Sequence, residues 1–155
     1  MSANPASTTV SIRDARDGDL EALIGLMGQL NDEPSPLTDR HRAAFKDVIA
    51  DRRQRLLVLE RAGVIVATAA VIIVPNIGRE GRPFAIVENV VVDAPARGEG
   101  MGGVLMRYII DEARRAGCYR ISLTSRKFRS DAHRFYERLG FVATSEGFRL
   151  ALELA

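Results

Sequence analysis

A glycine-rich segment that follows an apolar stretch is the part of the sequence best suited to hold a phosphate. Residues 90–93 read Val-Val-Val-Asp, and residues 97–103 read Arg-Gly-Glu-Gly-Met-Gly-Gly. An amphipathic pattern typical of a helix begins at these glycines. A strand that enters a helix through such a turn leaves free backbone N–H groups at the positive end of the helix dipole. The pattern therefore predicts a site for a phosphate or pyrophosphate group.

Three further roles for these glycines fit the sequence less well. Residues 98–103 match Gly-x-Gly-x-x-Gly, the fingerprint of dinucleotide-binding folds. That fingerprint normally lies in the first strand–helix unit, whereas here only about 50 residues follow it. The next predicted strand ends in Leu123-Thr124-Ser125, with no acid to bind a ribose hydroxyl. A P-loop is disfavoured because no Gly-Lys-Ser/Thr follows the turn. A turn that serves packing alone is also disfavoured, because packing requires fewer glycines.

A carboxylate interrupts the predicted strand that precedes the glycines. Glu88 lies in the otherwise apolar residues 84–92, where a charge is costly without a partner or a function. We interpret it as a candidate general base that acts through a water. An ion pair with an arginine, or a role in orienting a substrate, remains an alternative. By strand alternation, Asn89 is expected on the opposite face, with hydrogen bonds inside the sheet.

Hydrophobic periodicity predicts the elements that position these residues. Strands are expected at residues 9–13, 55–60, 64–74, 84–92 and 119–125, with a terminal hairpin over residues 141–152. Helices are expected over residues 20–30, 39–51, 101–116 and 131–139, with caps from Asp17, Thr38 and Ser130. This order predicts an α+β domain with α/β-like character around one mixed sheet. We expect residues 9–155 to form a single domain and residues 1–8 to be a flexible N-terminus.

Composition narrows the classes of function. The 155 residues are enough for one domain with a real core, and 46% hydrophobic with 27% charged residues is an ordinary globular balance. The net charge is +2 and the basic residues are scattered, so we expect no nucleic-acid partner. The longest apolar run, residues 64–74, is about half of a membrane span, so we expect no membrane partner.

The cysteine and histidines favour neither a disulfide nor a metal site. Cys118 is the only cysteine, which excludes an intrachain disulfide and fits a cytoplasmic protein. Its position after a predicted helix favours a buried small residue over a nucleophile. His41 and His133 match no ligand spacing, so no metal is expected. The polar residues 1–9 contain no apolar segment typical of a signal peptide.

Two motifs resemble those of a known family. Residues 97–102 resemble the Arg/Gln-x-x-Gly-x-Gly/Ala motif of the GNAT superfamily of acyl-CoA-dependent N-acetyltransferases, and residues 90–93 are similar to its preceding fourth strand. Residues 135–141, Phe-Tyr-Glu-Arg-Leu-Gly-Phe, resemble its Phe-Tyr-x-x-x-Gly-Phe helix end. The two motifs cover about residues 84–142, and the element order matches over nearly the whole chain. Residues 117–121 and 130–136 are also similar to small-molecule branches that acetylate glucosamine phosphate or aminoalkylphosphonate.

The resemblance implies a fold and a reaction. The fold would be a GNAT-type single domain with a twisted, mixed, mostly antiparallel sheet of about 6–7 strands flanked by four helices. The reaction would transfer the acetyl group of acetyl-CoA to a primary amine of a small molecule, such as an amino sugar, an aminoalkyl compound or a polyamine. The alternatives are an N-acetyltransferase that acts on a protein, a peptide or tRNA, and a catalytically weak acyl-CoA-binding module. A homodimer is a family-level expectation.

The resemblance also assigns residues to acetyl-CoA. Backbone N–H groups of the glycine turn would bind the pyrophosphate, with added charge from Arg97, and the bulged strand before it would face the acetyl-pantetheine arm. The N–H of Val92 is expected to contact the developing oxyanion. The expected cofactor-binding residues are Val90, Val91, Val92, Arg97, Gly98, Glu99, Gly100, Met101, Gly102, Gly103 and Tyr136.

The remaining roles concern proton transfer and the acceptor. Tyr136 matches the family's candidate acid for the CoA thiolate, because a phenol of pKa about 10 suits a thiol leaving group. A core tyrosine is the alternative. Asp32 and Glu33 lie where the family builds its acceptor pocket, whereas Arg79 and Arg82 would favour an anionic acceptor, so the acceptor's charge stays open. Where many members carry a cofactor-contacting Asn, this chain carries Arg129.

Overall fold

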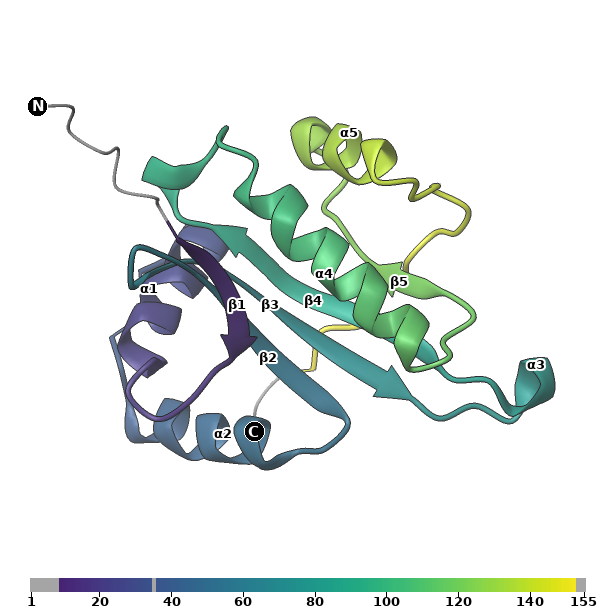
Figure 1. Ribbon diagram of the computed structural model, residues 1–155, viewed down its shortest axis with the longest axis horizontal. Coiled ribbons are helices and arrows are strands. Elements are labelled where there is room, and N and C mark those ends of the chain that lie inside the picture. Colours follow the sequence, from purple (N-terminus) through teal and green to yellow (C-terminus); the bar gives the residue numbers. More distant parts are fainter. Residues whose placement is uncertain (1–8, 35, 153–155) are drawn as a thin grey trace, which may run out of the picture. The chain divides into compact units, whose positions relative to one another are not determined.

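The computed structural model describes residues 9–34 and 36–152 and contains two compact units. The first unit ends at Leu123 and holds all the strands; the second begins at Thr124 and holds one helix (Figure 1). Within the described residues, no helix is long and apolar enough to span a membrane.

The first unit is built on one mixed sheet whose strands lie side by side in chain order. The strands are β1 (Val10–Asp14), β2 (Gln54–Arg61), β3 (Val64–Val74), β4 (Phe84–Val92) and β5 (Ile121–Leu123). The first three pairings are antiparallel and β4–β5 is parallel. The expected mixed, mostly antiparallel sheet is therefore confirmed, but the described residues contain five strands rather than the expected six or seven.

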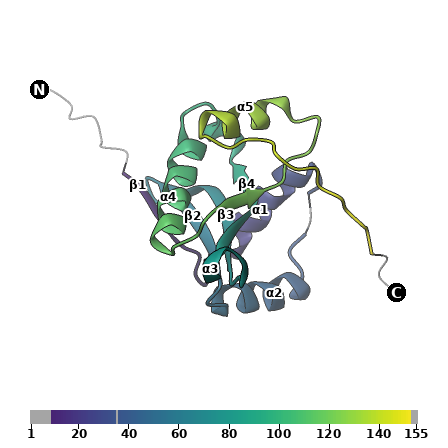
Figure 2. The ribbon, with the colours of Figure 1, turned by 90° about the vertical axis from the view of Figure 1, so that its right-hand side faces the viewer.

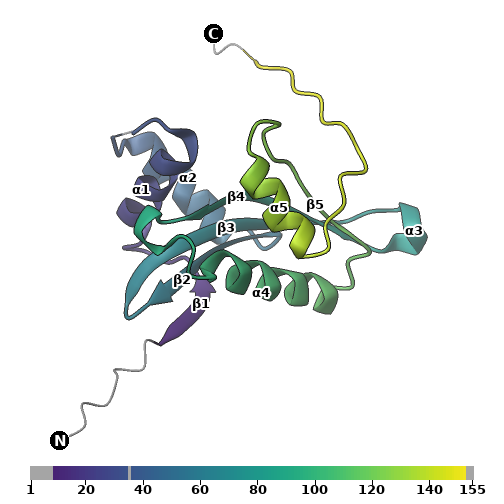
Figure 3. The same cartoon turned by 90° about the horizontal axis from the view of Figure 1, so that it is seen from above.

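Helices cover both faces of this sheet. Helices α1 (Leu20–Asn31) and α2 (Asp39–Ala50) lie on one side, and α4 (Met101–Arg115) lies on the other (Figures 2 and 3). The loop between β3 and β4 contains the short turn α3 (Gly78–Gly81). A 3-10 turn, η1 (Ala94–Ala96), joins β4 to the glycine-rich segment.

The two faces of β2 show how the sequence alternation builds these layers. Leu56 and Val58 pack in a cluster with Leu23 of α1 and Phe45 of α2. On the other side, Leu105, Met106 and Ile109 of α4 are fully buried. Burying a side chain of this size contributes about 1.5–3 kcal/mol, so α4 is held firmly behind the strands that carry the candidate site.

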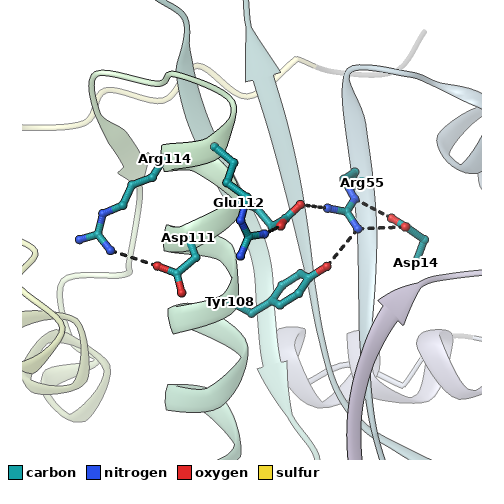
Figure 4. A network of polar contacts seen from close by, with 7 residues as sticks. Asp14, Arg55, Tyr108, Asp111, Glu112 and Arg114 are labelled. Carbon is teal, nitrogen blue, oxygen red and sulfur yellow. Dashed lines mark hydrogen bonds and ion pairs between the residues drawn. The ribbon is translucent and has the colours of Figure 1, made fainter.

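An ion-pair network ties α4 to the edge of the sheet. The Arg55 guanidinium on β2 donates to both carboxylate oxygens of Asp14 at 2.8 and 3.0 Å, to Glu112 at 2.5 Å and to the Tyr108 hydroxyl at 3.3 Å (Figure 4). These partners raise the pKa of Arg55, with Asp14 as the largest cause. The network links β1, β2 and α4, so its role is structural.

Of the three residues predicted to cap helices, only one does so. Thr38 caps α2 as expected: its hydroxyl accepts from the His41 N–H, and the His41 ring accepts from the Thr38 N–H. Asp17 does not cap α1, which begins after Asp19. The Asp19 carboxylate instead accepts from the Arg16 N–H at 2.9 Å and pairs with Arg13 at 2.7 Å, so ion pairing outcompetes capping here.

The second unit contains α5 (Ser130–Arg138) and an extended tail. Ser130 is the first helical residue rather than the cap, and Arg129 precedes it without a side-chain capping bond. Residues 141–152 form no strand, so the predicted hairpin is wrong. An alternating pattern makes a strand only where it has a partner, and an isolated two-stranded hairpin is marginal in water. The predicted strand at 119–125 likewise shrinks to β5, which pairs only with residues 85–87.

Candidate active site

Strand β4 contains a bulge just before the glycine-rich segment. Ala70 of β3 faces Glu88, but Thr68, two residues away, faces Val91, so β4 carries one extra residue at positions 89–90. Asn89 adopts a left-handed φ of +54°. A bulge leaves its extra residue outside the ladder and redirects the strand. The expected alternation is therefore wrong at this point, and both Glu88 and Asn89 are exposed.

The glycine turn presents a group of unused backbone donors. Gly98 and Gly100 have φ of +79° and +80°, which side chains disfavour, and a Cβ at either position would meet nothing within 4 Å. The first α4 hydrogen bond runs from the Val104 N–H to the Gly100 carbonyl at 3.1 Å. In the described part of the chain, the N–H groups of residues 98–103 have no backbone acceptor. The arrangement is suited to an anion, because the donors gather at the positive end of α4.

Two charged side chains of the turn are already engaged. Arg97 donates from Nε to the Val92 carbonyl at 2.9 Å and from Nη2 to the Gln29 side chain at 3.3 Å. Glu99 forms an ion pair with Arg61 at the end of β2, which offsets a negative charge close to the free donors. Arg97 thus ties the turn back to β4. Sequence reasoning missed Gln29, because a polar residue late in an amphipathic helix carries no distinctive signal.

Glu88 lies on the side of the sheet that α1 and α2 cover. Its cross-strand partner is Ala70, whose partner on β2 is Leu56, and paired residues share a face. The carboxylate is exposed, and among the described residues it makes no hydrogen bond or ion pair. Because the side chain is exposed, the cost expected for a charge in an apolar strand does not arise here. The carboxylate is therefore accessible to a water or a substrate.

A groove of about 600 Å³ runs along α1 on the same side. Its lining is Glu21, Ile24, Gly25, Gly28, Gln29, Asp32, Pro34 and Leu37. Two carboxylates, Glu21 and Asp32, border an otherwise mostly apolar surface, which suits a ligand with a cationic group. Glu33 is exposed but does not line the groove.

The arginines that would favour an anionic acceptor lie elsewhere in the first unit. Arg79 belongs to α3, and its guanidinium lies 5.6 Å from the centre of the Tyr119 ring. Figure 1 shows α3 beyond the end of the sheet, away from α1. Arg82 follows α3 and is exposed. The structure therefore does not bring these two residues to the groove.

Tyr136 belongs to the second unit, where it lies among aromatic rings. It is half-buried, with its ring centre 5.1 Å from that of Phe135 and 5.8 Å from that of Phe141. Burial raises the pKa of the phenol above its usual value, and the nearby Arg129 partly opposes this. The phenol is therefore protonated at neutral pH and has a proton to donate.

The histidines make local hydrogen bonds, and the cysteine is partly buried. His133 contacts the Arg126 carbonyl at 3.0 Å through Nε2, and His41 takes part in the α2 cap. Burial raises the pKa of the Cys118 thiol, which disfavours the reactive thiolate. Among the described residues, no group of three or more His, Cys, Asp or Glu is placed to hold a metal ion.

Comparison with known proteins places this fold and site in a family. The model of the acetyltransferase (GNAT) family matches residues 23–141. Glucosamine 6-phosphate N-acetyltransferase from Trypanosoma brucei brucei is 34% identical over 92% of this chain and 96% of its own length. A putative acetyltransferase structure from Agrobacterium tumefaciens superposes with a TM-score of 0.87 at 37% identity, covering 92% of this chain and 99% of that one. The glucosamine-6-phosphate N-acetyltransferase structure from Arabidopsis thaliana has a TM-score of 0.81 at 26% identity, covering 94% and 99%.

The chain belongs to the GNAT acetyltransferase family. It is an acyltransferase, and the cited relatives, matched over more than two thirds of their length, are glucosamine 6-phosphate N-acetyltransferases, a small-molecule amine branch. The expected family, fold class and enzyme class are thereby confirmed. The roles assigned to individual residues stay predictions.

Proposed function

We propose that this enzyme transfers the acetyl group of acetyl-CoA to the primary amine of a phosphorylated amino sugar of the glucosamine 6-phosphate type. The observation that carries the proposal is the 34% identity with the Trypanosoma enzyme over 92% of this chain and 96% of that one. Relatives of the same name from rice and Arabidopsis support it. GNAT enzymes use acetyl-CoA as their cosubstrate.

The pyrophosphate of acetyl-CoA is assigned to the glycine turn. The unpaired N–H groups of residues 98–103 would donate to its oxygens, and the glycines would let the backbone approach closely. Arg97 has a different proposed role from the one the sequence suggests. Its guanidinium fixes the turn against β4, so its main contribution is to shape the turn, with its charge as a secondary attraction.

The acetyl group is assigned to the bulged end of β4. Residues 90–92 would line the acetyl-pantetheine arm, and the Val92 N–H would donate to the thioester oxygen as its charge develops. A preorganised donor of this kind contributes about 2.7–4 kcal/mol in other acyl-transfer enzymes.

Proton transfer is assigned to Glu88 and Tyr136. An alkylammonium of pKa about 10 is not nucleophilic, so the amine must lose a proton before its nitrogen attacks the thioester carbon. Glu88, exposed on the α1 side of the sheet, would accept that proton through a water. As the carbon–sulfur bond breaks, the Tyr136 phenol would protonate the departing thiolate. The second role rests on the family motif and on the phenol's chemistry.

The acceptor is assigned to the groove along α1. Asp32 lines it and would attract an ammonium group, whereas Glu33 would act only at longer range. We assign both residues to the substrate, with the larger contribution from Asp32.

An enzyme with a single cysteine and scattered basic residues fits a cytoplasmic protein whose partners are small molecules rather than nucleic acid or membrane.

A homodimer is also proposed. The tail residues Val142, Phe148, Leu150 and Leu152 are 75–95% exposed, which is unusual for large apolar side chains in a row. Pairing of this tail with a second copy would give its alternating pattern a partner. Sedimentation or light scattering should report twice the 17.0 kDa chain mass. A monomer at micromolar concentration would contradict this part of the proposal.

A thiol-release assay with an amine panel tests the main proposal. Glucosamine 6-phosphate, glucosamine, an aminoalkylphosphonate, spermidine and a short peptide would each be mixed with acetyl-CoA and enzyme. We expect the fastest release of CoA with glucosamine 6-phosphate, and mass spectrometry would identify the acetylated product. Tight acetyl-CoA binding without thiol release from any amine would identify a binding module instead.

A further inference from the structure

Gln29 is placed where the groove and the glycine turn meet. It lies in the last turn of α1, is half-buried and lines the groove. The same side chain makes three hydrogen bonds to the segment that leads from β4 into the turn. Its Nε2 donates to Asp93 Oδ1 at 2.7 Å, and its Oε1 accepts from the Ala94 N–H at 2.9 Å and from Arg97 at 3.3 Å.

The amide of Gln29 is matched to its partners in polarity. Asp93 offers only an acceptor when ionised, while Ala94 and Arg97 offer only donors. A primary amide satisfies both demands at once, whereas a carboxylate in its place would meet the Asp93 carboxylate at hydrogen-bond distance. Among the described residues, Gln29 is the only side-chain partner of Asp93. This carboxylate therefore depends on Gln29 for its orientation.

The three bonds act on the backbone that supplies the free donors. The Ala94 N–H is fixed at the start of η1, and Arg97 is held between Gln29 and the Val92 carbonyl just before Gly98. A segment that is already ordered does not have to be ordered when the ligand arrives, so its affinity for the ligand is higher.

We propose that Gln29 is a positioning residue that preorganises the glycine turn for acetyl-CoA and links it to the wall of the acceptor groove. The inference rests on the proposed function, since it takes acetyl-CoA as the ligand of the turn. A ligand that moves Gln29 from the groove side also perturbs Asp93, Ala94 and Arg97, so the two binding events are coupled through this amide.

Acetyl-CoA dissociation constants measured by calorimetry test the inference. Gln29→Ala is expected to weaken binding about tenfold, the loss that follows from one to two hydrogen bonds. Gln29→Glu should weaken it at least as much, because two carboxylates then face each other. Adding Asp93→Asn to Gln29→Glu restores a donor opposite an acceptor and should return the affinity to within about threefold of wild type.

Gln54→Ala is the matched control. Gln54 is the other glutamine of the chain, and within the described residues its side chain makes no hydrogen bond. We expect its acetyl-CoA affinity to be that of the wild type. Thermal unfolding of every variant shows that the fold persists, and recovery in the double variant separates positioning from a general loss of stability.

Steady-state kinetics distinguish a positioning role of Gln29 from a general loss of folding stability. With the amine that the thiol-release panel identifies, Gln29→Ala should raise the KM values for acetyl-CoA and amine together while kcat changes less. Wild-type protein that fails to bind acetyl-CoA overturns the proposed function and this inference together. Wild-type binding with unchanged affinity in Gln29→Ala, or no recovery in the double variant, overturns the role of Gln29 alone.

Discussion

The glycine turn and the groove along α1 differ in the atoms that they offer a ligand. The turn offers backbone N–H groups, at residues 98–103, and its side chains Arg97 and Glu99 are engaged by neighbouring groups. The groove offers side chains, with Asp32 and Glu21 at its border and apolar residues between them. A backbone site depends on conformation and tolerates few substitutions. A side-chain site depends on chemical groups and can be retuned one residue at a time.

The largest effect is expected from the backbone site. Gly100→Val forces a β-branched side chain into a φ of +80°, which disfavours the turn conformation that presents the donors. We expect acetyl-CoA affinity to fall more than about a hundredfold, by calorimetry, with about 1–3 kcal/mol of stability lost to strain.

Gly63→Val is the control for that strain. Gly63 has a φ of +79° in the β2–β3 turn, and a Cβ there would also meet nothing within 4 Å. It should lose similar stability but keep its affinity. Equal affinities in the two variants would contradict the assignment of the pyrophosphate to the turn.

The next effect concerns the exposed carboxylate on β4. Glu88→Gln removes the proposed base and should lower kcat about 10²–10³-fold while leaving the acetyl-CoA dissociation constant unchanged. The deficit should shrink as pH rises toward the pKa of the amine, because more of the amine is then already neutral. A deficit that stays constant with pH would indicate an orienting role.

A smaller effect is expected from the proposed acid that protonates the CoA thiolate. Tyr136→Phe keeps the ring contacts with Phe135 and Phe141 but removes the proton, so kcat should fall about 10–100-fold with little change in KM. Because burial raises the pKa of this phenol, wild-type activity should show no loss from its ionisation below about pH 10. A wild-type rate in Tyr136→Phe would remove the acid role.

The smallest effect is expected from a single groove carboxylate. Asp32→Asn should raise the KM for a cationic amine about three- to tenfold, since an exposed charge attracts its ligand through water. Glu33→Gln, next to it but outside the groove, should raise it less than twofold. Initial rates at low salt measure both. Equal effects would mean that general charge, rather than the groove, attracts the amine.

The contrast between a backbone site and a side-chain site also explains which features the sequence could predict. Glycine is the residue that a left-handed turn requires, so residues 98–103 indicate their conformation, and the apolar runs of β2, β3 and β4 indicate the sheet. Gln29 gives no such signal, because its importance depends on Asp93 and Arg97, 64 and 68 residues away in the chain. The exposure of Asn89 next to Glu88 could not be predicted because the bulge at Asn89 breaks the alternation expected of a regular strand.

The ion pair between Arg61 and Glu99 has a consequence for the speed of cofactor capture. An anionic ligand that diffuses toward the turn experiences the summed field of the charges around it. Glu99 alone would repel it, but Arg61 converts that charge into a nearly neutral pair and leaves the cations Arg97 and Arg107 beside the donors. The association rate should therefore decline only modestly as salt is added. Neutralising Arg61 should slow arrival of the cofactor more than it speeds its departure.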